Sequence, residues 1–248
     1  MKGYSCFAAY YDALTKNVDY PHRADYFLEL FARVEHAPGL LLDLACGTGS
    51  LTLELAARGV DVFGADASAE MLSVAQQKAA EAGKSILFLC QPMQRLNLFG
   101  TVDTVICALD SINHLTGEKQ VQAAFSRVSL FLNPGGYFLF DVNTIYKHRE
   151  VLGNNAFIYE QENLFCAWQN SYVEKGHRVD IKLDFFARGE DGLYARREES
   201  FCEHAYEEAH LDRMLLEAGL EIVGKYDDLS FQPPTETSER MIYLARKV

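Results

Sequence analysis

The sequence predicts an α/β fold, in which a doubly wound, mostly parallel seven-stranded sheet is joined by a small antiparallel β insert. Three observations support this prediction. Strand-like and helix-like segments alternate over residues 40–145, which is typical of a parallel sheet with helices on both faces. Residues 155–205 instead alternate apolar and polar side chains with a period of two, as half-buried strands do. A helical pattern and two further strand-like runs then follow.

The first 145 residues supply five of the predicted strands. An amphipathic helix is predicted at residues 25–34, and it ends where Pro38 and Gly39 follow. The strands are short apolar runs, as expected where both faces of a sheet are covered: residues 40–45, 60–65, 86–90, 101–109 and 137–142. The helices predicted between these strands lie at residues 48–58, 69–82 and 119–132.

The insert is predicted to be a meander of antiparallel strands. Its runs lie at residues 157–159, 165–173, 179–186 and 194–202. The connections at residues 174–177 and 189–192 are short and contain glycine, which indicates hairpins. The main sheet is then completed by a helix at residues 207–218 and strands at residues 220–226 and 241–246.

Length and composition agree with one large domain that contains an insertion. The 248 residues are 49% apolar, so the chain can bury a core without a disulfide or a metal. We expect three regions: a core with an N-terminal helical segment at residues 1–145, the insert at residues 155–205, and a helix and strands at residues 206–248 that complete the core.

Charge and cysteine usage exclude several classes of protein. The chain has 23 basic and 35 acidic residues and a net charge of −12, which argues against binding of bulk nucleic acid or anionic lipid. No apolar run approaches the ~20 residues of a membrane span and no signal peptide is visible, so we expect a cytoplasmic protein. The six cysteines include no Cys-x-x-Cys pair, so we expect no metal site of that kind.

The most informative stretch is residues 40–50, LLLDLACGTGS. A glycine turn between a strand and a helix lets the backbone approach a ligand closely and directs helix N–H groups at it. Asp43 lies four residues before Gly47. Asp66 follows the second strand, where a carboxylate accepts hydrogen bonds from both hydroxyls of a ribose. These features predict a nucleoside site.

Two kinds of nucleotide site do not fit this stretch. The dinucleotide fingerprint requires glycine or alanine three residues after Gly49, where this chain has Thr52. A nicotinamide oxidoreductase is therefore a distant alternative. The phosphate loop of nucleotide triphosphatases, G-x-x-x-x-G-K-[S/T], does not occur in the chain. What remains is a nucleoside ligand without a pyrophosphate.

These motifs resemble those of the bacterial, Rossmann-like class I S-adenosylmethionine-dependent methyltransferases. The run DLACGTG at residues 43–49 is similar to the family's glycine loop, and LNPGG at residues 132–136 is similar to the turn before its fifth strand. Residues 7–12, 66–71 and 103–115 extend the similarity, which covers about residues 5–145. The resemblance implies methyl transfer with S-adenosylmethionine as the cofactor.

The resemblance also implies which residues bind the cofactor: Asp43, Ala45, Gly47, Gly49, Asp66, Ala67, Met71 and Leu109. It places Asp43 at the amino group of the cofactor, Asp66 at the ribose hydroxyls, and Ala67 and Met71 on the adenine. The other four contact the methionine part and the ribose.

The adenine end departs from the family pattern. The family often has an acid before a methionine after its third strand, and that acid binds the adenine amino group. Here the run is Gln91-Pro92-Met93-Gln94, and Pro92 offers neither a carboxylate nor an N–H donor. Adenine recognition would then use Gln91, Gln94 or the backbone of Met93.

Each candidate also has a purely structural interpretation. Asp43 and Asp66 suit a strand end or a helix cap, and Met71 and Met93 suit a core.

Three residues above the expected cofactor are further candidates. Tyr11 or Tyr20 either closes over the cofactor or belongs to a helix face that packs on the sheet. His114 is either a base near the transferred methyl or a hydrogen-bonded loop residue. The catalytic residue stays unassigned, with His114 and Tyr11 as the candidates.

The acceptor is constrained mainly by what the chain lacks. Methyl transfer from a sulfonium requires alignment more than a fixed catalytic group, so the motif identifies the cofactor better than the acceptor. The Asn/Asp-Pro-Pro-Tyr box of amino-directed nucleic-acid methyltransferases and the Pro-Cys nucleophile of cytosine methylation are both missing. We expect transfer to N or O of a small molecule by a monomer or homodimer. A methyltransferase for RNA or protein and a non-catalytic cofactor-binding regulatory or scaffold protein are the alternatives.

The insert lies where family members build a cover over the acceptor. Its aromatic residues either form a cavity for a small molecule or dock the insert onto the core or onto a second subunit. They are Tyr159, Phe165, Trp168, Tyr172, Phe185 and Tyr194.

Overall fold

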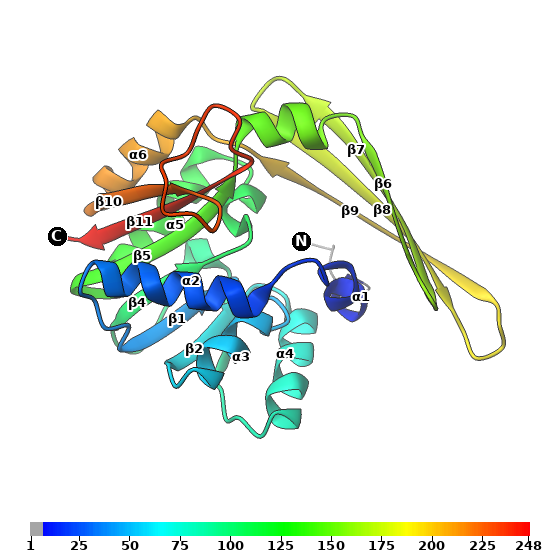
Figure 1. The fold of residues 1–248 in the computed structure, drawn as a ribbon, viewed down its shortest axis with the longest axis horizontal. Helices are drawn as coiled ribbons and strands as arrows, with labels where there is room; N and C mark the ends of the chain where they lie inside the picture. The colour runs from blue at the N-terminus through cyan, green and yellow to red at the C-terminus, as the bar shows by residue number, and fades with distance from the viewer. Residues whose placement is uncertain (1–6) are drawn as a thin grey trace.

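The main sheet of the protein has seven strands in the order β10-β11-β5-β4-β1-β2-β3 (Figure 1). The computed structural model describes residues 7–248. The strands are β1 Leu40–Leu44, β2 Asp61–Asp66, β3 Phe88–Cys90, β4 Val102–Cys107, β5 Leu132–Asn143, β10 Leu220–Asp227 and β11 Arg240–Lys247. Only β11 runs antiparallel to its neighbours, β5 and β10, whereas β1 to β5 pair in parallel. The mostly parallel seven-stranded sheet that the sequence predicts is confirmed.

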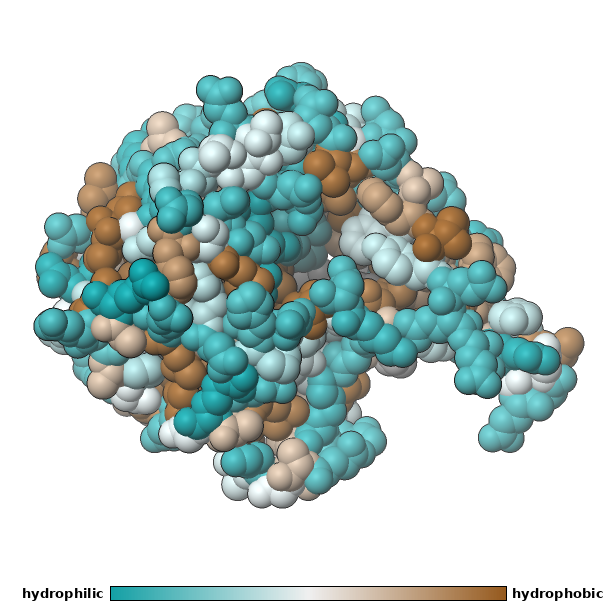
Figure 2. Space-filling model, in the orientation of Figure 1, coloured by the Kyte–Doolittle hydropathy of each residue, from teal (hydrophilic) through white to brown (hydrophobic). Residues whose placement is uncertain are grey.

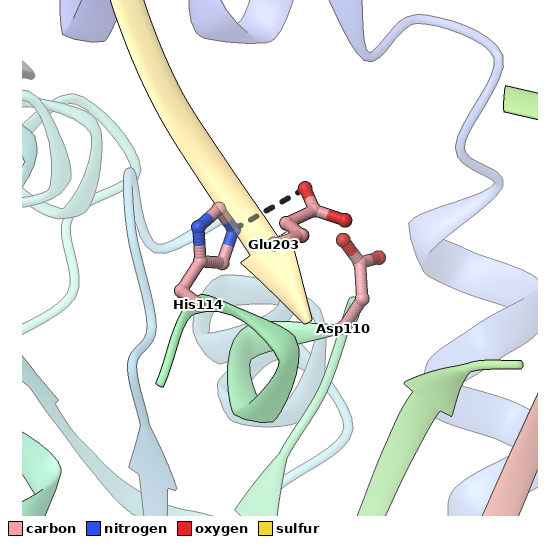
Figure 3. Close-up of side chains that lie close together, drawn as sticks. All are labelled: Asp110, His114 and Glu203. Atoms are coloured by element: carbon pink, nitrogen blue, oxygen red, sulfur yellow. Dashed lines mark ion pairs between the residues drawn. The ribbon is translucent and has the colours of Figure 1, made fainter. Parts of the chain in front are cut away.

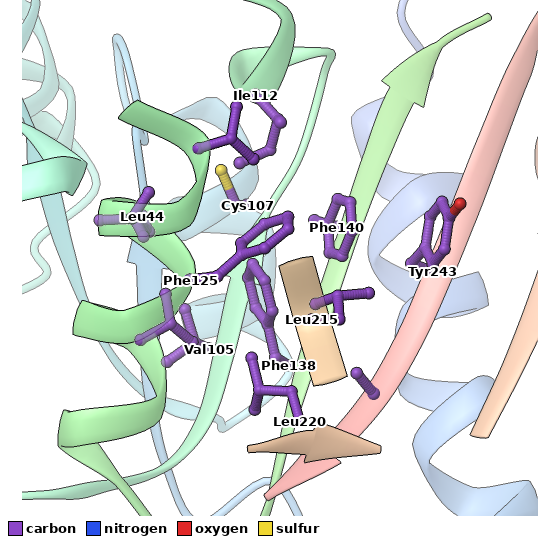
Figure 4. Packing of buried hydrophobic residues seen from close by; sticks show 14 of the residues in the cluster. Leu44, Val105, Cys107, Ile112, Phe125, Phe138, Phe140, Leu215, Leu220 and Tyr243 are labelled. Atoms are coloured by element: carbon purple, nitrogen blue, oxygen red, sulfur yellow. The ribbon is translucent and has the colours of Figure 1, made fainter. Parts of the chain in front are cut away.

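Helices cover both faces of this sheet because neighbouring strand residues point to opposite sides. In β1, Leu42 belongs to one buried cluster and Leu41 to another. The first cluster includes Phe125 of α5 and Leu215 of α6 (Figure 4). The second includes Phe27 of α2. The helices are α2 Tyr20–Arg33, α3 Ser50–Ala57, α4 Ala69–Glu81, α5 Glu118–Phe131 and α6 Glu208–Glu217.

Side-chain caps fix where two of these helices begin. The helix α2 starts at Tyr20, five residues before the predicted start, because Asp19 accepts a 3.0 Å hydrogen bond from the N–H of His22 and a proline lies in the first turn. Ser68 caps α4 by accepting a hydrogen bond from the N–H of Met71 at 3.2 Å. This cap places the first turn of α4 beside the end of β2.

Three short helices were not predicted by the periodicity of the sequence. They are η1 Met93–Arg95, η2 Ser111–His114 and η3 Lys147–Leu152, of which η3 is a π-helix. They follow β3, β4 and β5 respectively, at the carboxyl ends of these parallel strands. In sheets of this kind ligands bind at that edge. Residues of η1 and η2 line the candidate site.

The insert forms a separate four-stranded antiparallel sheet in the order β6-β7-β8-β9. Its strands are β6 Ala156–Gln161, β7 Leu164–Val173, β8 Arg178–Arg188 and β9 Tyr194–His204. Figure 1 shows this sheet extending away from the main sheet as an arm. The predicted meander is therefore present, with strands a few residues longer than the sequence pattern indicated.

The helix α1, Phe7–Leu14, lies between the insert and the main sheet (Figure 1). Its Leu14 shares a buried cluster with Phe185 of β8 and with Met71 of α4. The ring of Tyr10 stacks on Phe185 with centroids 5.5 Å apart. The N-terminal aromatic segment thus joins the two sheets and does not pack on the main sheet alone.

Candidate active site

A cavity of about 680 Å³ lies between the main sheet and the insert. Figure 2 shows the molecule hollowed between its rounded core and the arm of the insert. The cavity is lined by most of the residues singled out from the sequence: Tyr11, Ala45, Gly47, Asp66, Ala67, Met71, Met93, Gln94, Leu109 and His114. Asp43 and Tyr20 line a recess of about 40 Å³, which also contacts Tyr11, Ala45 and Gly47. Gly49 lines neither space.

The glycine loop turns through left-handed backbone at three positions, Ala45, Gly47 and Gly49, with φ of 60°, 55° and 74°. No atom lies within 4 Å of the place where a side chain on Gly47 would begin, so this residue leaves the loop open to the cavity. Gly49 differs, because a Cβ there would lie 3.0 Å from the Cβ of Ala75. Gly49 therefore permits close packing of α3 against α4, whereas the resemblance implied that it contacts the cofactor.

Asp43 is buried at the end of β1, with 2% of its surface exposed. Burial raises the pKa of its carboxyl group to about 7, against the effect of the Thr52 hydroxyl, which donates a 2.6 Å hydrogen bond to it. Thr52 is the residue that departs from the dinucleotide fingerprint. The Thr52 hydroxyl lies beside the end of β1, where it orients the Asp43 carboxyl group.

Asp66 at the end of β2 connects the glycine loop to the start of α4. Its two carboxylate oxygens accept hydrogen bonds from the N–H of Gly47 at 2.9 Å and from the N–H of Ser68 at 2.8 Å. Burial raises the pKa of Asp66, and these two N–H donors partly offset that rise. The carboxylate is therefore held in one orientation, and a carboxylate oxygen with one bond can accept another from a ligand.

The loop after β3 holds its two glutamines differently. The Gln91 side chain accepts a 2.7 Å hydrogen bond from the N–H of Asn97 and donates one of 3.1 Å to the Asn97 carbonyl. These bonds close the loop and occupy the Gln91 amide. Gln91 and Gln94 both line the cavity, and Gln94 lies in η1 beside Met93. Of the two glutamine side chains, Gln94 is better placed to meet an adenine.

The end of β4 is shaped by a buried carboxylate that sequence reasoning missed. Leu109 and Asp110 both have positive φ, 58° and 52°, which is an uncommon conformation for residues with side chains. Their N–H groups donate hydrogen bonds of 2.9 and 2.6 Å to Asp141, which is fully buried on β5. Asp141 therefore holds the turn that presents Leu109 to the cavity.

Two arginines balance this buried charge. Arg240 on β11 donates to Asp141 and also to Asp110 at 2.6 Å. Burial alone would raise the pKa of Asp110, but Arg240, Lys147 and His114 together outweigh burial and hold this pKa below its usual range. Arg23 of α2 lies 3.6 Å from Asp141. These residues are up to 217 positions apart and form no local motif, so no pattern in the sequence indicates that they meet.

The helix α1 is held over the cavity by hydrogen bonds to the main domain and to the insert. Asp12 accepts hydrogen bonds from Thr48 at 2.6 Å and from Lys78 at 2.7 Å, which ties α1 to the glycine loop and to α4. On the other side Gln161 of β6 donates a 2.5 Å hydrogen bond to the carbonyl of Ala13. Tyr11 is held between these contacts and faces the cavity.

The insert supplies three residues to the cavity, Trp168, Phe201 and Glu203. They face the end of the cavity where His114 lies, and the His114 and Phe201 rings are 5.4 Å apart. Glu203 is buried, with 5% of its surface exposed, and its Oε1 lies 3.8 Å from His114 Nε2 (Figure 3). The other aromatics predicted for a cavity do different things: Phe185 packs on α1, and Tyr194 is 56% exposed.

Comparison with known proteins agrees with this geometry. A family model described as a methyltransferase domain matches residues 41–136. Over 247 residues the chain is 34% identical to a protein of Geobacillus sp. (strain WCH70) that is named as a methyltransferase, covering 98% of this chain and 99% of that one. A glycine/sarcosine N-methyltransferase of Parasynechococcus marenigrum (strain WH8102) is 26% identical, over 95% of this chain and 82% of its own length.

A solved structure shows the same fold. The crystal structure of an S-adenosylmethionine-dependent methyltransferase from Clostridium acetobutylicum ATCC 824 superposes with a TM-score of 0.88 and 35% identity, covering 98% of each chain. The chain belongs to the class I S-adenosylmethionine-dependent methyltransferases, a family whose cofactor is S-adenosylmethionine. Within residues 7–248, no helix is both long and apolar enough to cross a membrane.

Proposed function

We propose that this protein transfers a methyl group from S-adenosylmethionine to the nitrogen or oxygen of a small-molecule acceptor bound between the main sheet and the insert. One observation carries the proposal: the same cavity is lined by Gly47 and Asp66 beside the main sheet and by Trp168 and Glu203 of the insert. Cofactor and acceptor would thus meet inside one cavity, which Leu109 also lines.

The fixed hydrogen bonds of the cofactor end support particular roles. Asp66, oriented by two backbone N–H groups, would accept hydrogen bonds from the ribose hydroxyls. Ala67 and Met71 at the start of α4 would pack on the adenine, and Ala45 and Gly47 would meet the methionine part through their backbone. Asp43 lines the adjoining recess. From there it would orient the amino group of the cofactor, either through the backbone of the glycine loop or through a water molecule.

The small size of the acceptor is supported by the way the cavity is covered. The helix α1 bridges the glycine loop and β6, so that Tyr11 lies over the cavity and little length of a polymer could enter. Two carboxylates, Asp110 and Glu203, line the acceptor end, which disfavours the phosphates of RNA. A relative that aligns over 95% of this chain is named for N-methylation of glycine and sarcosine, which are small molecules.

The chemistry requires positioning above all. The bound cofactor supplies a methyl group on a sulfonium, which is a good leaving group. The residues of the chain hold the acceptor atom in line with that methyl, exclude water through α1 and the insert, and take a proton where the acceptor must lose one. His114 and Tyr11 line the cavity and remain candidates for contact with the acceptor.

Calorimetric titration with S-adenosylmethionine and S-adenosylhomocysteine tests the cofactor site. We expect micromolar binding that Asp66→Ala abolishes. Asp61→Ala is the matched control, because Asp61 is the exposed first residue of the same strand and should leave binding unchanged. The absence of binding to either compound by folded protein would overturn the proposal. Binding without any methylated product from a small-molecule extract would favour the non-catalytic alternative.

A further inference from the structure

Three ionisable side chains from separate segments meet at the acceptor end of the cavity (Figure 3). Asp110 follows β4, His114 ends η2 and Glu203 lies near the end of β9. One carboxylate or imidazole atom from each residue lies within 4.8 Å of the corresponding atoms of the other two. All three residues line the cavity, so a ligand at this end meets two carboxylates and an imidazole.

A fourth residue, His148, lies against Glu203. His148 of η3 is fully buried, and its Nδ1 lies 2.9 Å from the carbonyl oxygen of His177. A carbonyl oxygen only accepts, so Nδ1 carries the hydrogen. The other ring nitrogen, Nε2, makes no hydrogen bond within the described part of the chain and lies 3.5 Å from Glu203 Oε2. A neutral His148 therefore turns a lone pair toward the carboxylate.

Two acceptors that face each other in a buried place are unfavourable unless a proton lies between them. Glu203 Oε2 also accepts a 3.3 Å hydrogen bond from the Asn143 amide, but this donor does not separate the carboxylate from His148. One proton, shared by Glu203 and His148, would turn the repulsion into a charge-assisted hydrogen bond. Glu203 and His148 can therefore hold one proton between them, and Glu203 lines the cavity from which that proton would come.

We propose that the acceptor is an amine that enters as its ammonium ion, and that Glu203, backed by His148, both binds this ion and takes its proton. The inference rests on the proposed function and narrows it from nitrogen or oxygen to an amine nitrogen. Asp110 and His114 complete the ring of groups around the ammonium. Glu203 contacts the substrate in this scheme, whereas His148 acts only through Glu203.

The proton and the electron pair are accounted for in this scheme. The ammonium N–H bond breaks, and its proton passes to the Glu203 and His148 pair. The lone pair that is left on the nitrogen attacks the methyl carbon of the cofactor. The N–CH₃ bond forms while the C–S bond breaks, and the sulfur keeps the electron pair of that bond. The products are the methylated ammonium and S-adenosylhomocysteine, and the pair then returns its proton to solvent.

An ammonium fits this place better than a metal ion does. The three atoms, one from each of Asp110, His114 and Glu203, lie within 4.8 Å of one another. A nitrogen placed at the centre of this triangle would be at most about 2.8 Å from each of them, which is a hydrogen-bond length. Arg240 already donates to Asp110 at 2.6 Å, and its charge would repel a divalent cation more strongly than a monovalent one. The ring of Phe201, 5.4 Å from that of His114, and the ring of Trp168, which lines the same cavity, suit the carbon part of an amine.

Calorimetry of the full chain, saturated with S-adenosylhomocysteine, tests the inference at neutral pH. The probes are two matched pairs, benzylamine with benzyl alcohol and butylamine with butanol, because each pair differs only in the charged group. We expect at least one amine to bind roughly tenfold or more tightly than its alcohol, as a charge-assisted contact requires. Equal binding within both pairs would overturn the inference while leaving cofactor binding, and hence the proposed function, intact.

Variants and a metal titration complete the test. Glu203→Gln should remove the preference for the amine and keep the affinity for S-adenosylhomocysteine. Glu198→Gln is the matched control, because Glu198 lies on the same strand, is half exposed and does not line the cavity. Binding of Mn²⁺ that requires Glu203 and excludes the amines would overturn the inference in favour of a metal site. An amine preference that survives Glu203→Gln would also contradict it.

Discussion

The hydroxyl of Thr52 donates a 2.6 Å hydrogen bond to the carboxyl group of Asp43, and both residues are buried. Thr52 stands where dinucleotide-binding folds have a small residue for close packing of helix on strand. In this protein the same position supplies a neutral hydrogen-bond donor to a carboxyl group that burial keeps partly protonated near neutral pH. Thr52, which breaks the dinucleotide-binding motif, therefore helps to hold Asp43 in the candidate cofactor site.

Replacing Asp43 should change how stability depends on pH. The pKa of Asp43 is raised from 3.8 to about 7, which corresponds to at most about 4 kcal/mol. The folded state then binds more protons than the unfolded state between these values, so Asp43 costs stability as pH rises through them. Asp43→Asn should gain stability relative to the parent protein between about pH 5 and about pH 8. Urea unfolding at both pH values checks this, and a constant difference would contradict it.

Removing the donor should have the opposite effect. Thr52→Val leaves the ionised Asp43 carboxylate without its hydroxyl partner, which should cost about 2 kcal/mol of unfolding free energy above neutral pH. Thr52→Ser keeps a hydroxyl and serves as the control. The cost should shrink at lower pH, where the carboxyl group is protonated. Denaturant titration of both variants measures it, and equal stability of Thr52→Val and Thr52→Ser would rule the bond out as a stabilising contact.

The fold was predictable because its determinants are local. The apolar run of β1, the glycine turn after it and the period-two pattern of the insert each depend on a few neighbouring residues. The boundaries were less predictable, since α2 starts where Asp19 caps it and not where its apolar pattern begins. The short helices η1, η2 and η3 have too few turns for a periodic pattern to show.

Sequence reasoning reached most of the glycine-loop side of the site, and His114 at the acceptor side, but missed the residues around His114. The glycine loop and Asp66 each lie at the end of a predicted strand, in short local patterns that the sequence shows. Glu203, Arg240 and Asp141 come together only through the pairing of distant strands, and their types and spacing form no motif. The same reason explains Gly49, whose role in packing α3 on α4 depends on a contact with Ala75 that the motif does not reveal.

Asp141 should be the most sensitive carboxylate of the buried ion cluster. Asp141→Asn leaves Arg240 and Arg23 with one anion fewer in a buried place, which should cost about 3–5 kcal/mol. It should also weaken cofactor binding, because Asp141 holds the turn at Leu109. Asp228→Asn is the control, since Asp228 pairs with the same arginines but has a side chain that is 36% exposed, so it should cost about 1 kcal/mol or less. Similar losses for both variants would contradict this ranking.

The contact between Asp12 and Lys78 should control how fast the cofactor product leaves. Lys78 lies 2.7 Å from Asp12, which also accepts from Thr48 of the glycine loop. Lys78→Met should speed the dissociation of S-adenosylhomocysteine about fivefold, because α1 is released more often, with little change in association. Lys84→Met, beyond the end of the same helix, is the control. Stopped-flow displacement measures both rates, and unchanged dissociation would argue against α1 as a cover.

Substitutions of the two glutamines after β3 should have different effects, one on stability and the other on adenine recognition. Gln91 is occupied by its two hydrogen bonds with Asn97, so Gln91→Ala should lower stability and leave ligand preference unchanged. Gln94 lines the cavity, and its side-chain carbonyl can accept from the adenine amino group. Gln94→Ala should therefore reduce the preference for S-adenosylhomocysteine over S-inosylhomocysteine by about tenfold, as loss of one hydrogen bond implies. Calorimetry with both compounds measures that ratio. A ratio that Gln94→Ala leaves unchanged would instead assign adenine recognition to the backbone of Met93, because Pro92 has no N–H to donate.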